Sequence, residues 1–188
     1  SADVDLHVYA DSQSSGGELR HVYMETELFG VPVFDGDVSA HLDRNGRLLR
    51  LQRGYLPAAP RTLAPALSPR RALELALRAV APDLDADITV ISEDVGPRRN
   101  SVYSSPQLPS EIRVGLVWFP VDGEARAAWR LYLDLGGAHA YQIILDADDG
   151  AVLFSLNLVR EADPVGSVLQ APSTPNPTAG APVTQPLS

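Results

Sequence analysis

Residues 21–54, HVYMETELFGVPVFDGDVSAHLDRNGRLLRLQRG, decide how the first part of the chain folds, because they contain two strand patterns and the turn between them. Residues 33–43 carry apolar side chains at alternate positions, which is the period of a half-buried strand. Asp-Arg-Asn-Gly follows at residues 43–46, and Asn-Gly supplies the positive-φ positions of a tight hairpin. The leucines of residues 48–51 then predict a returning strand.

The residues before this hairpin extend the same pattern. Val4, Leu6 and Val8 alternate with polar neighbours and predict a first strand. Residues 20–29 form an extended segment that ends at Gly30. We therefore expect residues 1–56 to form a β module.

A helical period replaces the strand period after a proline-rich linker at residues 57–68. Ser68 is a good N-cap, and Pro69 suits the first turn. Pro82 stops the predicted helix of residues 69–81. Its apolar stripe consists of Ala72, Leu75, Ala76, Ala79 and Val80.

The region that follows the helix reads as a series of strands. We expect one strand at residues 88–91 and a polar loop at residues 96–109. Four more strands carry alternating apolar residues and are separated by Gly-containing turns, at residues 112–118, 129–135, 141–145 and 152–158. Residues 69–160 thus predict a helix packed on an antiparallel sheet, and the chain as a whole an α+β fold.

Residues 161–188 differ in composition from the rest. Six of the last 29 residues are proline, mixed with Ser, Thr, Gly and Ala. Such a segment buries too little apolar area to offset the entropy of ordering it. We expect an irregular, Pro-rich tail, which is either a linker or a ligand for a groove.

Composition excludes several classes of function. The formal net charge is −9, all 15 basic residues are Arg, and no basic stripe indicates a nucleic-acid or anionic-membrane partner. Without cysteine the chain has no disulfide, thiol nucleophile or thiolate ligand. No apolar run is long enough to span a bilayer. The chain opens at Ser1 without a basic and apolar leader, so we expect a signal peptide to have been removed or not included.

No constellation of residues predicts catalysis or a metal site. The four histidines include no HExxH pattern. His21 and His41 lie on predicted neighbouring strands and can meet, but two imidazoles without a third ligand favour a hydrogen-bonding role. Asp148-Asp149-Gly150 fits a hairpin turn better than a calcium loop.

Two pairs of side chains carry structural expectations. Glu25 and Glu27 are two apart on a strand, so they should point to one face and be solvated. Trp118 and Trp129 lie on adjacent predicted strands and should form a cross-strand core pair.

The first part of the chain resembles the N-terminal propeptide module of fungalysin/thermolysin-type secreted zinc proteases. The consensus sequence of the family is His-Val-Arg, an aromatic residue, two Gln, Gly-Ile/Val-Pro-Val-Phe-Gly-Gly, a strand, and His-Leu-Asp before a Gly turn. The chain departs from it at Tyr23, Met24, Glu25, Thr26 and Asp35. The matching residues are His21, Val22, Gly30, Val31, Pro32, Val33, Phe34, Gly36, His41, Leu42, Asp43 and Gly46.

The resemblance implies a fold and a function. Residues 69–159 look like the PepSY-type domain that follows in such propeptides, and both parts would be cystatin-like, each with a helix against a curved antiparallel sheet. The chain would be a non-catalytic, secreted propeptide that acts as intramolecular chaperone and inhibitor of a zinc metalloprotease and is removed by proteolysis. It would need no cofactor of its own, whereas zinc, with calcium as a second candidate, would be held by the cognate catalytic domain.

The end of the chain adds one expectation. Thr184, Gln185, Pro186, Leu187 and Ser188 would lie in or near the active-site cleft of the protease like a product, with Ser188 as a processed terminus; an arbitrary boundary at Ser188 is the other reading. Two other functions stay open. One is a free-standing extracellular protease inhibitor or protein-binding module, and the other is a cystatin-like domain that binds or converts a small molecule.

Overall fold

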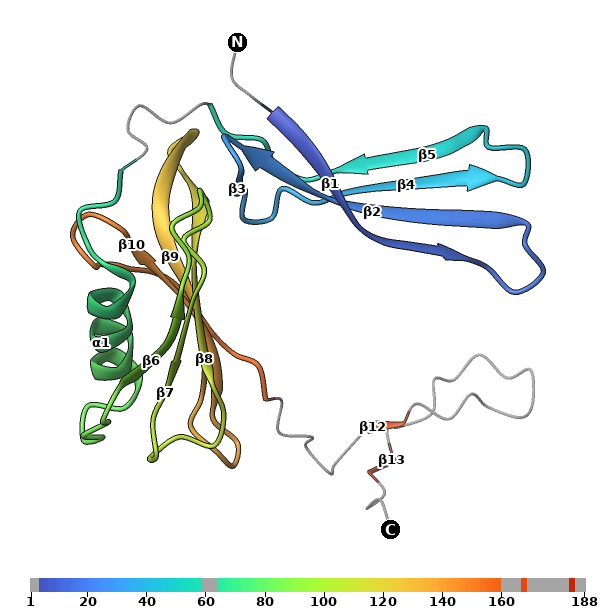
Figure 1. The fold of residues 1–188 in the computed structure, drawn as a ribbon. Helices are drawn as coiled ribbons and strands as arrows, with labels where there is room; N and C mark the ends of the chain where they lie inside the picture. The colour runs from blue at the N-terminus through green and yellow to red at the C-terminus, as the bar shows by residue number, and fades with distance from the viewer. Residues whose placement is uncertain (1–3, 59–63, 160–166, 169–182, 185–188) are drawn as a thin grey trace. The chain divides into compact units, whose positions relative to one another are not determined.

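The computed structural model describes residues 4–58, 64–159, 167–168 and 183–184 of the 188-residue chain. Residues 1–158 form one compact unit, built from two antiparallel sheets and one helix, and residues 159–188 are a second unit (Figure 1).

The first sheet consists of strands from the N-terminal third of the chain. Its strand order is β1-β2-β4-β5, and the short β3 pairs with β2. The strands are β1 (Val4–Gln13), β2 (Leu19–Leu28), β3 (Val31–Pro32), β4 (Val38–Asp43) and β5 (Leu48–Arg53). The predicted hairpin is confirmed, because β4 and β5 pair antiparallel across the turn at residues 43–46.

The second sheet has six strands in the order β11-β10-β9-β8-β7-β6. The strands are β6 (Thr89–Glu93), β7 (Ser101–Ser104), β8 (Ile112–Val121), β9 (Glu124–Asp134), β10 (Ala140–Asp146) and β11 (Val152–Asn157). Each strand pairs with the next one along the chain, so this sheet is an antiparallel meander.

The prediction of a polar loop at residues 96–109 is wrong, since β7 lies inside it. Ser101 and Tyr103 of β7 are both buried, and β7 pairs with β6 and β8. A strand of four residues with two serines carries too weak a period to be recognised without its neighbours.

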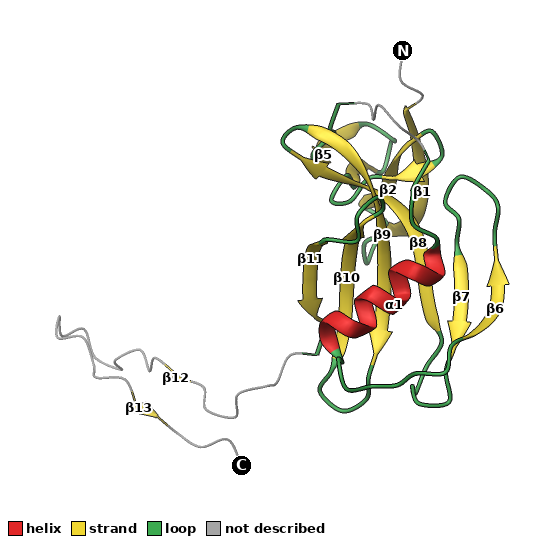
Figure 2. Ribbon diagram, turned by 90° about the vertical axis from the view of Figure 1, so that its left-hand side faces the viewer, coloured by secondary structure: helices red, strands yellow, loops and turns green. Residues whose placement is uncertain are grey.

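Helix α1 (Pro69–Val80) follows the local signals in the sequence. The Ser68 hydroxyl accepts a hydrogen bond from the Arg71 amide at 3.2 Å, as an N-cap does, and Pro69 opens the first turn. The helix lies across one face of the second sheet, where Ala72, Leu73, Ala76 and Leu77 are buried (Figure 2). The predicted apolar stripe was partly wrong, because it left out Leu73 and Leu77 and included Ala79, which is exposed.

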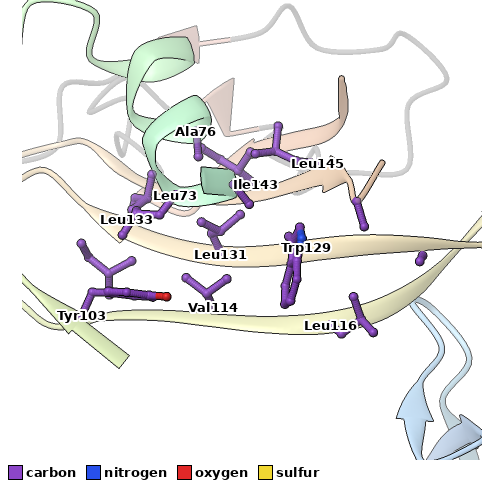
Figure 3. Close-up of a cluster of buried hydrophobic side chains, with 14 of the residues drawn as sticks. Leu73, Ala76, Tyr103, Val114, Leu116, Trp129, Leu131, Leu133, Ile143 and Leu145 are labelled. Atoms are coloured by element: carbon purple, nitrogen blue, oxygen red, sulfur yellow. The ribbon is translucent and has the colours of Figure 1, made fainter. Parts of the chain in front are cut away.

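The core fills the space between α1 and the second sheet. Figure 3 shows Leu73 and Ala76 of the helix in one cluster with Leu131, Ile143 and Leu145 of the sheet, all of them buried. Trp118 and Trp129 are fully buried on the same face, but the register pairs Leu116 with Trp129 and Trp118 with Ala127. The two tryptophans are therefore diagonal neighbours in the core rather than directly opposite each other.

The expected α+β, cystatin-like class is wrong, and the described fold is mostly β. α1 is 12 residues long and packs on β8, β9 and β10 of the second sheet. Among the described residues no helix covers the first sheet, although the resemblance implied one for each part. The reason is visible in the sequence, because the helical period is confined to the stretch after Ser68.

The second unit is described only at two short strands. β12 (Ser167–Val168) pairs antiparallel with β13 (Val183–Thr184). The expectation for the rest of the proline-rich tail lies outside the described residues.

Candidate protein-interaction surface

The two motif histidines meet on one face of the first sheet. His21 of β2 and His41 of β4 are register partners. Their Nδ1 atoms are 2.6 Å apart, and the rings are nearly perpendicular with centroids 4.8 Å apart. Such a contact needs one nitrogen to donate and the other to accept. The arrangement suits a hydrogen bond that joins two strands.

Asp43 and Gly46 shape the hairpin turn between β4 and β5. The Asp43 carboxylate accepts from the amides of Asn45 and Arg47, at 2.8 and 2.9 Å. Gly46 has φ 79°, a conformation that glycine adopts without steric cost. These two residues therefore set the turn itself.

The motif segment 30–36 joins the first sheet to the second. Val33 forms a parallel bridge with Trp118 of β8, and the Phe34 amide donates to the Trp118 carbonyl at 2.9 Å. In return, Nε1 of Trp118 donates to the carbonyl of Leu28 at 2.8 Å. Val31 and Val33 are only 4% exposed. We call this set of contacts the β3–β8 joint.

Other motif residues hold this segment in shape. Gly30 has φ 73°, which starts the reversal from β2 into β3. The Phe34 ring stacks on Phe119 and lies against Phe154, both at 5.2 Å between centroids. A side chain at Gly36 would collide with Val33 at 2.8 Å. The geometry assigns these motif residues to architecture.

An ion-pair cluster adds a polar link between the two sheets. Arg98, in the loop after β6, pairs with Glu25 and Glu27 of β2, and its Nη2 lies 2.8 Å from Glu25 Oε2. Burial lowers the pKa of Arg98, but the hydrogen bonds and charges of the two glutamates outweigh it, so the pKa is raised. The expectation that these glutamates are solvated is wrong, because both pair with Arg98. It could not have been corrected from the sequence, since no local pattern pairs a glutamate with a distant arginine.

One face of the first sheet carries exposed apolar side chains on both of its edge strands. The register places Val4, Leu6 and Val8 of β1 opposite Leu28, Thr26 and Met24 of β2. Leu51 of β5 lies opposite Ala40 of β4 on the same face, and Leu48 lies opposite Leu42. We call Val4, Leu6, Val8, Leu48 and Leu51 the open apolar face.

The exposure of these five side chains is high for apolar residues on one surface. Leu6 is 53% exposed, Val8 50% and Leu51 56%. Single exposed apolar residues are ordinary, but a row of them such as Val4, Leu6 and Val8 along one edge strand marks a site of interaction with another molecule. Leu48 and Leu51 lie on the opposite edge strand, two strands away. β1 and β5 are also the edge strands of this sheet, and edge strands offer unpaired backbone groups to a partner.

Within the described residues, no group of three or more His, Asp or Glu side chains is placed to hold a metal ion. No helix in the same part of the chain is long and apolar enough to cross a membrane. Thr184 lies in β13, and the predicted cleft residues Gln185, Pro186, Leu187 and Ser188 lie outside the described residues.

Sequence reasoning missed the surface and the joint for different reasons. The alternation of Val4, Leu6 and Val8 shows that they share a face, but not that the face is left open. The hydrogen bond from Trp118 to Leu28 joins residues 90 positions apart, which no local pattern reveals.

Comparison with known proteins gives three results. The model of the Fungalysin/Thermolysin Propeptide Motif matches residues 4–53. No curated protein matches the chain. Among solved structures, the Bacillus megaterium YpeB C-terminal domain is similar at 13% identity and a TM-score of 0.37, with 81% of this chain and 56% of that chain covered. The chain thus spans about half the length of the solved structure it matches.

The matched residues coincide with the strands of the first sheet, from the start of β1 to the end of β5. They include the paired histidines, the hairpin turn and the segment of the β3–β8 joint. The match to the Fungalysin/Thermolysin Propeptide Motif therefore extends over the whole of the first sheet.

Proposed function

We propose that the chain is the propeptide of a secreted zinc metalloprotease and acts as both folding helper and inhibitor of the catalytic domain. The observation that carries the proposal is the propeptide motif at residues 4–53. The open apolar face supports it, since the same residues present a surface suited to another protein. The zinc would be held by the catalytic domain and not by this chain.

The physical argument for a folding helper rests on binding. A protease with high kinetic stability is protected by a large unfolding barrier and can have a large folding barrier as well. A prefolded partner that binds the native arrangement stabilises that arrangement by mass action, because it binds the folded protease and not the unfolded chain. The two sheets, fixed to each other by the β3–β8 joint, would supply such a partner.

The same binding accounts for inhibition. While propeptide and protease are one chain, the effective concentration of the inhibitor is on the order of millimolar. Cleavage of the connection turns it into a dissociable inhibitor, and its degradation then releases activity. The open apolar face is our candidate for the contact, because burying it would remove several large apolar side chains from water.

Co-expression with the catalytic domain tests the role. The catalytic domain is produced with this chain fused to it, with this chain supplied separately, and without it. We expect active protease only in the first two cases, and slower turnover when purified chain is added back. If the catalytic domain matures equally well without the chain, the chaperone role is contradicted. Inhibition of a protease that matures without the chain would instead favour a free-standing inhibitor.

Substitutions on the open apolar face test the contact. Leu6→Thr with Val8→Thr keeps residues that favour strands and removes exposed apolar area. We expect about tenfold weaker inhibition, from the loss of roughly 1–2 kcal/mol of apolar contact. The matched control is Ile91→Thr with Val152→Thr, two side chains of the second sheet that are 51% and 49% exposed. Equal weakening by both double variants would remove the open apolar face from the proposal.

A further inference from the structure

A hollow on the second sheet has features that the proposed function does not use. It has a volume of about 870 Å³ and lies on the face opposite α1. Its lining comes from β7, β8, β9 and their loops: Asn100, Ser101, Val102, Ser110, Glu111, Arg113, Val114, Gly115, Arg130 and Tyr132. The volume lies within the range of small-ligand and short-peptide pockets.

The register brings two arginines together in this hollow. Arg113 of β8 lies opposite Tyr132 of β9, and Arg130 lies opposite Gly115. Arg113 and Arg130 are therefore diagonal neighbours on one face, a separation of about 7–8 Å between backbone positions. The guanidinium carbon of Arg130 lies 5.9 Å from the centre of the Tyr132 ring.

Gly115 contributes no side chain to the hollow beside Arg113 and Arg130. A Cβ at this position would lie 2.7 Å from Oδ1 of Asn100, so the amide of Asn100 lies over the space that a side chain would fill. Because Gly115 is the residue opposite Arg130, no side chain of β8 stands directly opposite this arginine. The hollow is thus a result of the sequence at this position.

The charge of the hollow contrasts with that of the chain. The formal net charge of the protein is −9, and Arg20, Arg70, Arg71, Arg98 and Arg126 each form an ion pair. Within residues 4–58 and 64–159, no ion pair joins Arg113 or Arg130 to a carboxylate, although Glu111 also lines the hollow. Among the described residues neither guanidinium group forms an ion pair, so both are placed to receive a carboxylate from outside. Arg130 also lines a neighbouring hollow with Glu25, Asp35 and Asp37.

We propose that this hollow binds a peptide segment that carries Asp or Glu side chains. Guanidinium groups bind carboxylates through paired hydrogen bonds, so Arg113 and Arg130 would each take one carboxylate or share two. Tyr132, 42% exposed, offers an apolar surface to the aliphatic part of the segment, and Asn100 offers an amide to its backbone. The size of the hollow favours several residues over a single small anion.

A peptide-binding measurement tests the proposal without any protease, so its result is independent of the proposed function. The probe is a fluorescein-labelled, end-capped peptide of alternating glycine and glutamate, followed by fluorescence anisotropy with the full chain. We expect saturable binding that weakens with salt, and weaker or no binding of the counterpart with glutamine. Equal binding of the two peptides would overturn the proposal.

Variants locate the binding. Arg113→Gln with Arg130→Gln should weaken binding about tenfold or more, since hydrogen bonds to charged groups are lost. The matched control, Arg44→Gln with Arg47→Gln, removes the same charge from the exposed hairpin turn and should leave binding unchanged. Gly115→Ala adds no charge but displaces Asn100, and it should also weaken binding. Equal losses in the two double variants would contradict the assignment.

A second copy of this acidic chain is the rival occupant. Native mass spectrometry of the full chain would detect it as a dimer that is lost in Arg113→Gln with Arg130→Gln. That result would overturn the proposal by assigning the hollow to self-association. A monomer in both cases, with binding of the glutamate peptide, supports it.

Discussion

At the scale of single residues, Tyr103 shows how burial determines chemistry. Its ring is fully buried, and its hydroxyl donates to Oε1 of Glu93 at 3.0 Å. Burial and the neighbouring Glu93 raise the pKa of Tyr103 to about 12. The neutral form is therefore favoured in the folded protein more than in the unfolded chain.

This shift predicts loss of stability in alkali. Below the unfolded pKa of Tyr, about 10, the stabilisation is fully present, and it is lost as pH rises through about 12. We expect the free energy of unfolding to fall by up to about 1.4 kcal/mol per pH unit in this window. Because the chain contains no lysine, no ammonium group of a side chain titrates there. Tyr103→Phe should flatten the dependence in urea melts at pH 10, 11 and 12, and an equally steep fall in this variant would contradict the assignment.

The contact between His21 and His41 predicts a measurable coupling. A double-mutant cycle with His21→Ala and His41→Ala should give about 1 kcal/mol of interaction free energy, because each single change leaves a half-buried ring without its partner. The control cycle pairs His21→Ala with Ser12→Ala, its register neighbour on β1. Additive effects in both cycles would show that the histidine contact contributes no stability.

At the scale of elements, close backbone packing fixes where β5 ends. A Cβ at Gly54 would lie 1.9 Å from the carbonyl oxygen of Asp35, and the Gly54 amide donates to the Asp37 carbonyl at 2.7 Å. The end of the hairpin is therefore pressed against the turn that leads into β4.

Gly54→Ala should destabilise the protein by about 1–3 kcal/mol, because a backbone atom cannot move aside as a side chain can. Gly96→Ala is the control, since the nearest atoms there belong to the flexible side chain of Asp94, and its effect should stay within about 0.5 kcal/mol. Thermal melts of the two variants decide between these outcomes. Similar melting temperatures would mean that the turn at residues 35–37 yields easily.

The elements also show which parts of the fold were predictable. α1 and the hairpin at residues 43–46 follow from Ser68, Pro69 and Asn45-Gly46, whose effects act over a few residues. β7 did not follow, because its burial depends on β6 and β8 on either side. The fold class was wrong for a related reason, since one clear helix received too much weight against many short strands.

At the scale of the whole molecule, the relation between the sheets depends on contacts between distant residues. The β3–β8 joint and the cluster of Arg98, Glu25 and Glu27 both link the first sheet to the second. The motif residues were recognised from their match to the consensus sequence of the family. Their role in the β3–β8 joint was not predicted, because their partner residues lie far along the chain. The open apolar face escaped prediction because exposure depends on what covers a strand.

The variant Arg98→Met measures how much the ion-pair cluster contributes to the free energy of unfolding. The change would leave Glu25 and Glu27 facing each other with side chains only 21% and 13% exposed. We expect a loss of about 1–3 kcal/mol in the free energy of unfolding. Urea titration followed by tryptophan fluorescence measures it, and adding Glu27→Gln should recover part of the loss. No recovery would show that repulsion between the two glutamates is not the cause.

The hydrogen bond from Trp118 to Leu28 limits how the first fifty residues can be used by themselves. In an isolated fragment of these residues, Val31 and Val33 would be exposed to water, because the strand that covers them would be missing. A protein into which the fragment is inserted would have to supply an indole in the place of Trp118. Inserting the motif into an unrelated protein should therefore give a poorly ordered, aggregation-prone segment unless β8, which carries Trp118, is inserted with it.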